Sequence, residues 1–183
     1  MPRINPLQND ELDSATAETL SGVAKKLGMV PNLFATLAHA PAALNSYLNY
    51  SDNLSKGALT NKQRETIALA VAQYNQCQYC LSAHHLIGKG AGLSEEDIAK
   101  ARNGQAENAL DNAIASFARE VTQTRGVVSN TTFKTFSEQG LTHSLMVEIV
   151  ANVALNLLTN YVNHLAETEI DFPEVDLVNQ HAA

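Results

Sequence analysis

The sequence contains no tryptophan, and phenylalanine and tyrosine together make up only 5% of its 183 residues. Sandwiches and barrels of β-strands depend on aromatic and β-branched residues, whereas the alanine and leucine that are abundant here favour helices. A chain of this length buries enough apolar surface to fold without a disulfide or a metal ion. The composition therefore predicts an all-α domain.

Cysteine is almost absent too, because the chain has only Cys77 and Cys80, which stand three positions apart. A scaffold held together by disulfides needs more cysteines at wider spacings. A close pair in a chain of this length indicates a redox centre or part of a metal site. The two cysteines therefore concern the chemistry of the protein and not its folding.

Basic residues are few and scattered: 12 lysines and arginines stand against 19 aspartates and glutamates, which gives a net charge of −7. Proteins that bind nucleic acid usually present a clustered basic face, so we expect no nucleic-acid partner. No segment approaches about 20 uninterrupted apolar residues, and residues 1–6 lack the features of a signal peptide. We therefore expect a soluble, cytoplasmic protein without a membrane partner.

Capping residues and apolar periodicity divide the chain into helices. Thr60 and Gln63 form a capping-box pattern, Ser94 and Asp97 form a weaker one, and Gly28 is a typical helix stop. We expect an arm over residues 1–14 and a single compact domain of about eight helices over residues 15–183. The helical segments run over about 15–27, 33–38, 41–56, 61–75, 77–90, 95–104, 106–125, 130–139 and 142–167.

Segments 59–84 and 141–167 show a weak internal similarity. In each, a Leu-Thr pair precedes a glutamate, and Cys77 and Cys80 of the first segment correspond to Asn160 and Asn163 of the second. Few other positions are identical and the spacing from threonine to glutamate differs by one, so chance similarity explains the pattern as well as duplication does. A true repeat would give the domain two pseudo-repeated halves, one of them active.

Cys77, Cys80 and His84 lie on one face of the helix expected from residue 77, because positions i, i+3 and i+7 nearly superimpose. Residues three apart in a helix have Cα atoms roughly 5 Å apart, which suits a disulfide. The unpaired N–H groups and the dipole of the first helical turn stabilise a thiolate. His84 can accept or return a proton beside it.

Glu65 is expected to reach the histidine and not a sulfur atom. If the helices before and after residue 76 form an antiparallel hairpin, Glu65 lies level with about Ile87. That position is about one helical turn beyond His84 and two beyond Cys80. The expected order is therefore Glu65, His84, Cys80, with a simple salt bridge as the alternative role for Glu65.

Other roles for the conspicuous polar residues stay open. The cysteines and His84 could bind zinc, although no second ligand cluster follows, or the cysteines could be inert core residues. Tyr79, between the cysteines, could serve only in packing. Four asparagines at helical spacing on an otherwise apolar helix could bond across a helix or subunit interface, or could line a pocket opposite the thiols; they are Asn152, Asn156, Asn160 and Asn163.

At Glu65, Cys77-x-x-Cys80 and His84, residues 59–93 resemble the alkylhydroperoxidase D family within the carboxymuconolactone decarboxylase superfamily. Further positions are similar to its peroxidase-related branch, so the resemblance covers most of the chain. These positions are Gly28-x-Val30-Pro31-Asn32-x-Phe34, Pro41, Asn160-x-x-Asn163 and Glu169-x-Asp171-Phe172.

The resemblance implies an all-helical, homo-oligomeric enzyme that reduces hydrogen peroxide or alkyl hydroperoxides. It implies that Cys80 attacks the peroxide and that Cys77 resolves the resulting sulfenic acid. It implies further that Glu65 and His84 form the proton relay. No organic cofactor or metal is required, but an external dithiol has to reduce the Cys77–Cys80 disulfide.

One position departs from the pattern, because the best-known members carry a histidine immediately before the second cysteine, where this chain has Tyr79. The choice of attacking cysteine is also open on physical grounds. The first cysteine of thioredoxin-like motifs is usually the more activated because it lies nearer the helix start. The short distance expected between His84 and Cys80, one turn apart, favours the second cysteine.

Two other functions suit the same features. A cofactor-free reaction of the lactone decarboxylase type would use the same fold, although members of that branch generally do not need a Cys-x-x-Cys pair. A non-enzymatic redox-sensing module would use oxidation of Cys77 and Cys80 to alter its assembly without turnover.

Overall fold

A computed structural model describes residues 1–178 of the protein. Within this range the chain has no strand and consists of helices joined by short turns, so the predicted all-α class is confirmed. The elements are the 3-10 helix η1 (Asn9–Glu11) and the α-helices α1 (Ser14–Leu27), α2 (Asn32–Leu37), α3 (Pro41–Leu54), α4 (Asn61–Tyr74), α5 (Gln78–Gly90), α6 (Glu95–Arg102), α7 (Ala109–Thr124), α8 (Asn130–Glu138) and α9 (His143–Ala166).

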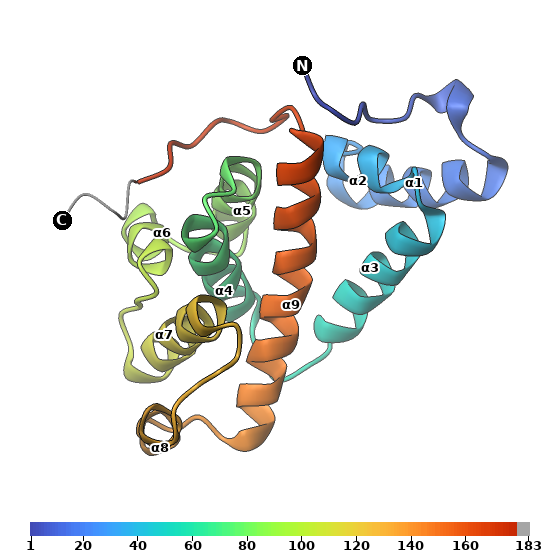
Figure 1. Ribbon diagram of the computed structural model, residues 1–183. Coiled ribbons are helices and arrows are strands. Elements are labelled where there is room, and N and C mark those ends of the chain that lie inside the picture. The colour runs from blue at the N-terminus through green and yellow to red at the C-terminus, as the bar shows by residue number, and fades with distance from the viewer. Residues whose placement is uncertain (179–183) are drawn as a thin grey trace.

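The long helix α9 divides the domain into two parts (Figure 1). On one side it packs against α4, α5 and α7, and on the other against α2 and α3. Helix α4 lies at the centre of the first part and contacts α5, α6, α7 and α9. Every residue of α4 from Thr66 to Gln73 is buried, as its apolar sequence predicts.

The capping residues found in the sequence begin and end these helices. Thr60 caps α4 and shares a capping box with Gln63, and Ser94 forms the same box with Asp97 at α6. Gly28 ends α1 with φ of 80°, a left-handed conformation that glycine adopts without a steric penalty. The expected helix boundaries are therefore confirmed to within a few residues at these positions.

Two clusters of buried side chains form the core, and α4 contributes to both. Leu69 and Ala72 belong to the cluster that joins α4 to α2, α3, α5 and α6. Ile67 and Val71 face the other cluster, which joins α4 to α7, α8 and α9. Because α4 is fixed on both sides, it provides a rigid support for Glu65 at its first turns.

The turn between α4 and α5 sets the geometry of the site. Gln76 adopts a left-handed conformation with φ of 57°, and the backbone N–H of Cys77 donates to the carbonyl of Ala72 at 2.9 Å. This arrangement ends α4 and lets α5 turn back along it. The predicted helical hairpin is therefore present.

The two segments with weak internal similarity fold differently. Residues 61–90 form the hairpin of α4 and α5, which is broken at Gln76, whereas residues 143–166 form one uninterrupted helix. The segments thus do not repeat one local structure, although Asn160 and Asn163 lie close to the cysteines with which the sequence aligns them.

Helix α9 is the one described helix that is long and apolar enough to cross a membrane, with a mean hydropathy of 1.4 over its most apolar window. The core helix of a soluble domain passes the same test. The buried face of α9 carries the asparagine stripe, and these amides contact other helices or the helix backbone.

The first residues of the chain are tied to the end of α9. The backbone N–H groups of Arg3 and Ile4 both donate to the carbonyl of Ala166, at 2.7 and 3.2 Å. Arg3 also forms an ion pair with Glu167, which ends α9 in a left-handed conformation. These contacts satisfy backbone groups that a helix end leaves without partners.

Candidate active site

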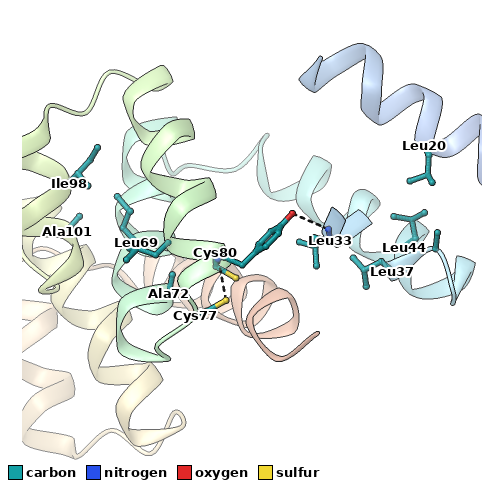
Figure 2. Close-up of a cluster of buried hydrophobic side chains, with 13 residues drawn as sticks. Leu20, Leu33, Leu37, Leu44, Leu69, Ala72, Cys77, Cys80, Ile98 and Ala101 are labelled. Atoms are coloured by element: carbon teal, nitrogen blue, oxygen red, sulfur yellow. Dashed lines mark hydrogen bonds between the residues drawn. The ribbon is translucent and has the colours of Figure 1, made fainter. Parts of the chain in front are cut away.

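The two cysteines lie at the start of α5, and both are buried and unoxidised. Cys77 is the N-cap residue of the helix, and its Sγ accepts a hydrogen bond from the backbone N–H of Cys80 at 3.4 Å (Figure 2). The sequence placed both cysteines in the first turn. The structure refines this, because Cys77 caps the turn from outside while Cys80 is within it.

Cys80 opens onto a cavity of about 330 Å³. His84, Glu65 and Tyr47 share this cavity, whereas Cys77 is not among the described residues that line it. The rest of the lining is mainly apolar and comes from the end of α1, from α2 and the turn before it, from α3, α5 and α9, and from the segment after α9. A molecule in this cavity would therefore meet the sulfur of Cys80 before that of Cys77.

His84 and Glu65 form a close pair at the edge of this cavity. His84 Nδ1 lies 2.8 Å from Oε2 of Glu65, and the two side chains are mostly buried. A carboxylate can only accept a hydrogen bond, so Nδ1 carries the proton and donates it. The expected contact of Glu65 with the histidine is thus confirmed, and Nε2 of His84 is left to act on other groups.

The surroundings of Cys80 favour a thiolate. Burial by itself would raise the pKa of this thiol. Hydrogen bonds from Cys77 and Asn163 outweigh burial, and with the charge of His84 they lower the pKa of Cys80 to about 7. A substantial fraction of Cys80, about half, is therefore ionised at neutral pH.

The neighbouring groups respond to that charge. The hydrogen bond that the Cys77 thiol gives to Cys80, together with burial, raises the pKa of Cys77 far above its usual value. Burial disfavours a charged imidazole at His84, but the negative charges of Glu65 and Cys80 outweigh it and raise the pKa of His84. The arrangement is therefore a thiolate at Cys80 with protons held on Cys77 and His84.

The four asparagines of α9 form two pairs according to their hydrogen-bond partners. Asn163 Nδ2 donates to Sγ of Cys80 at 3.2 Å, and Oδ1 of Asn160 accepts from the side chain of Asn75 at 2.8 Å. Asn152 and Asn156 instead donate to carbonyls one turn earlier on their own helix. The proposed place opposite the thiols therefore holds for Asn163, which the sequence could not distinguish from the others.

Tyr79 supports the wall of the cavity. Its hydroxyl accepts a hydrogen bond from the backbone N–H of Leu33 at 3.1 Å, and its ring packs edge-on against Phe172, with the ring centroids 5.6 Å apart. Burial raises the pKa of Tyr79 beyond the physiological range, so the phenol stays neutral. Tyr79, which stands where the best-known members have a histidine, thus holds α2 and the segment after α9 against α5.

The motifs around residues 30 and 170 meet beside this tyrosine. The backbone N–H of Asn32 donates to Oδ2 of Asp171 at 2.7 Å, and Nδ2 of Asn32 donates to the carbonyl of Glu169 at 3.1 Å. These bonds cap α2 and hold Phe172 against the cavity. The two motifs therefore act together to shape the wall opposite α5.

Tyr47 of α3 is a site residue that no sequence motif points to. It lines the cavity opposite Cys80, and its pKa is raised by burial and then by the negative charges of Cys80 and Glu65. Its phenol thus offers a neutral O–H donor to the space above the thiolate. No motif surrounds Tyr47 in the sequence, and only the tertiary packing of α3 brings it to the site.

The mouth of the cavity is unusually apolar. Leu27, Met29, Leu86 and Ile87 line it and are 52%, 37%, 48% and 43% exposed. A cluster of exposed apolar side chains often marks a surface that receives an apolar ligand or partner.

A larger cavity of about 430 Å³ lies between α1 and α3 but lacks Cys80, His84 and Glu65. We assign the site to the smaller cavity because the reactive groups lie there.

The described residues include no group of three or more histidine, cysteine, aspartate or glutamate side chains placed to hold a metal ion. The paired residue of His84 is Glu65, and that of His85 is Glu95 of α6, with His85 Nε2 and Glu95 Oε2 3.3 Å apart. His85 therefore points away from the thiols, as its helical position predicts.

Comparison with known proteins agrees with this geometry. The model of the carboxymuconolactone decarboxylase family matches residues 37–124, which include Glu65, both cysteines and His84. A solved alkylhydroperoxidase D core, an uncharacterised peroxidase-related protein from Ralstonia eutropha JMP134, is 27% identical and has a TM-score of 0.83. The match covers 93% of this chain and 92% of that one. Just under half of this chain is thus similar to the carboxymuconolactone decarboxylase family, and nearly the whole chain shares the fold of the alkylhydroperoxidase D core.

Other solved structures show how widely this alkylhydroperoxidase D-like fold is used. An uncharacterised peroxidase-related protein from Silicibacter sp. TM1040 is 21% identical, with a TM-score of 0.79 and coverage of 91% of each chain. A debrominase, Bmp8, solved in complex with 2,3,4-tribromopyrrole, is 17% identical with a TM-score of 0.77 over 92% of this chain and 91% of that chain. No curated protein sequence matches the chain. Proteins that share this fold thus include a debrominase as well as proteins named as peroxidase-related.

Proposed function

We propose that this protein is a thiol peroxidase that reduces alkyl hydroperoxides or hydrogen peroxide with Cys80 as the attacking residue. The observation that carries the proposal is the position of Cys80. Its sulfur opens onto the cavity that also contains His84 and Glu65, and Asn163 donates to it at 3.2 Å. A thiolate is the nucleophile in such chemistry, and the lowered pKa of Cys80, about 7, supplies a thiolate fraction at neutral pH that an ordinary cysteine lacks.

In the first step the thiolate of Cys80 attacks the terminal oxygen of the hydroperoxide. The S–O bond forms as the O–O bond breaks, and the alkoxide leaves. Protonated His84, held through Nδ1 by Glu65, gives its proton to the alkoxide, which departs as alcohol. Cys80 is then a sulfenic acid, with the transferred oxygen bound to sulfur.

In the second step Cys77 resolves that sulfenic acid. Its sulfur attacks Sγ of Cys80, the S–O bond breaks, and hydroxide leaves with the proton of the Cys77 thiol as water. The contact of Cys77 Sγ with the Cys80 backbone places the two residues close enough for this bond. An external dithiol then returns two electrons and two protons to the pair.

The shape of the site favours organic hydroperoxides over hydrogen peroxide. The cavity of about 330 Å³ is far larger than hydrogen peroxide, and its mouth is lined by exposed leucine, methionine and isoleucine. Burial of an apolar group contributes about 25 cal/mol per Å², so an alkyl or aryl substituent strengthens binding. We therefore expect cumene hydroperoxide to react faster than hydrogen peroxide.

A turnover assay with purified protein, cumene hydroperoxide and a panel of dithiols tests the proposal. Cys80→Ser and the double Cys77→Ser, Cys80→Ser variant should both lose turnover. Retained turnover of a lactone substrate by the double variant would instead support the decarboxylase alternative. Oxidation that changes the assembly of the protein, with no peroxide turnover for any dithiol, would support the redox-sensing alternative.

We propose further that the protein is a cytoplasmic homo-oligomer, as the family resemblance implies. A stripe of apolar side chains on α9 supports this, because it is exposed at helical spacing and faces away from the core. Its members are Val147, Val150, Leu158, Tyr161 and Leu165. Light scattering of the purified protein measures its mass, and Leu158→Asp should reduce that mass.

A further inference from the structure

The oxygen of the Asn160 side-chain amide makes a hydrogen bond, but its NH₂ group does not. Asn160 is fully buried, and its Oδ1 accepts from Nδ2 of Asn75 at 2.8 Å. Its own Nδ2 is buried as well and makes no hydrogen bond of normal length and angle to a described residue. Asn160 therefore presents a fixed N–H donor that is not fully used in the resting site.

A buried donor without an acceptor is rare in proteins because it loses the hydrogen bonds of water without replacement. Substitution of Asn160 by an apolar residue of similar size would remove that penalty. A donor kept in this state is instead suited to an acceptor that is present at only one stage of a reaction. The neighbouring groups show which acceptor that is.

Asn160 lies beside the reactive sulfur. It precedes Asn163 by one turn on the same face of α9, and Asn163 Nδ2 already donates to Sγ of Cys80 at 3.2 Å. Because Oδ1 of Asn160 is held by Asn75, the N–H side of the amide is the side left for the sulfur, and the amide helps to lower the pKa of the Cys80 thiol. The two amides therefore approach Cys80 from one helix.

The orientation of the Asn160 amide is fixed from outside the cavity. Asn75, at the end of α4, holds Oδ1 and leaves only the N–H side for Cys80. Both α4 and α9 are part of the packed core, so the donor does not need to reorganise during a reaction. Preorganised donors of this kind are effective because they stabilise charge where it develops.

We propose that Asn160 and Asn163 form an amide cradle for the oxygen that Cys80 takes from a hydroperoxide. Asn163 holds the sulfur as thiolate, and the unused N–H of Asn160 receives the transferred oxygen as the S–O bond forms. This inference rests on the proposed peroxidase function and assigns to it two residues of α9 that contact the reacting atoms.

The cradle adds a hydrogen bond to the first step, and the bonds made and broken and the proton transfer stay the same. As it bonds to Cys80 Sγ, the transferred oxygen accepts a hydrogen bond from Asn160 Nδ2 while the O–O bond breaks. The leaving alkoxide still takes its proton from His84. After Cys77 displaces that oxygen as water, Asn160 is again without an acceptor, which makes the cradle specific to the transition state and the sulfenic acid.

Single-turnover experiments in the Cys77→Ser background test the cradle, because only Cys80 reacts there. The ultraviolet absorbance of the thiolate gives the pKa of Cys80, and stopped-flow mixing with tert-butyl hydroperoxide gives the rate of the first step. Asn163→Ala should raise this pKa by about one unit, because a hydrogen bond to a charged group is lost. Asn160→Ala should slow the first step by about tenfold or more after correction for the thiolate fraction.

Asn152→Ala is the matched control, since it removes a buried asparagine of the same helix that donates to the carbonyl of Glu148. It should leave the pKa of Cys80 and the corrected rate within about twofold of the background protein. A corrected rate unchanged by Asn160→Ala, or a pKa unchanged by Asn163→Ala, would overturn the cradle. If the background protein itself fails to react with the hydroperoxide, the proposed function fails, while the pKa of Asn163→Ala still decides the thiolate half of the cradle.

Discussion

His84 Nδ1 and Glu65 Oε2 lie 2.8 Å apart, although 19 residues separate them in the sequence. The contact fixes the imidazole so that Nδ1 carries a proton and Nε2 is available to other groups. The contact joins the start of α4 to the second turn of α5. It places His84, whose pKa is raised, beside Cys80, whose pKa is lowered. Several properties of the protein follow from this pair.

Removal of the pair should slow the chemistry without abolishing disulfide formation. His84→Ala should reduce the rate of Cys80 oxidation by hydroperoxide by about a hundredfold, because general acid catalysis by a positioned side chain has this magnitude. Glu65→Gln should have a smaller effect, since it leaves the imidazole in place but removes the charge that raises its pKa. Stopped-flow kinetics measure both rates.

His85→Ala provides the control for this prediction, because His85 is adjacent in sequence but pairs with Glu95 outside the cavity. It should react at the rate of the unsubstituted protein. Equal losses in His84→Ala and His85→Ala would mean that the effect comes from a disturbed α5 and not from the relay.

The two cysteines should titrate very differently. The pKa of Cys80 is lowered to about 7, so its alkylation by iodoacetamide should rise with pH around a midpoint near 7. The pKa of Cys77 is raised, so that residue should stay unmodified through the same range. Peptide mapping by mass spectrometry after short reactions at a series of pH values checks both. Faster modification of Cys77 would exchange the proposed roles of the two residues.

Oxidation by one equivalent of hydroperoxide should join Cys77 to Cys80 within one chain. The two residues are adjacent at the start of α5, and the chain contains no third cysteine to compete. Non-reducing peptide mapping identifies the bond. A mainly intermolecular disulfide would be inconsistent with the geometry of the helix start.

Tyr79→Phe should lower the stability of the protein by about 1–3 kcal/mol, because the buried N–H of Leu33 loses its acceptor. For a domain of this size the melting temperature should fall by roughly 2–10 °C, which calorimetry measures. A melting temperature unchanged by Tyr79→Phe would show that this bond does not hold α2 to the site.

The local features of the fold were predictable from the sequence. Thr60, Ser94 and Gly28 act through neighbouring backbone groups, so their roles depend on residues within one or two turns. The contact of Glu65 with His84 followed from helical periodicity across one tight turn. In both cases short-range geometry determines the result, and the sequence contains that geometry directly.

The contributions of Asn163 and Tyr47 could not be found in this way. Asn163 belongs to a stripe of four similar residues, and only the packing of α9 on α5 decides which amide meets the sulfur. Tyr47 reaches the cavity because α3 folds back across α9. Such contacts depend on helix crossings that hydrophobic periodicity does not specify.

The N-cap of α5 is itself one of the reacting groups. Cys77 Sγ accepts the N–H of Cys80 only while it is a free thiol in this position, and serine, threonine or aspartate usually fills such a place. We expect that a bond between Cys77 and the sulfur of Cys80 weakens this cap and loosens the first turn of α5, and that reduction restores it. Under the proposed function, the stability of the start of α5 would then differ between the reduced protein and the protein that has just turned over a peroxide.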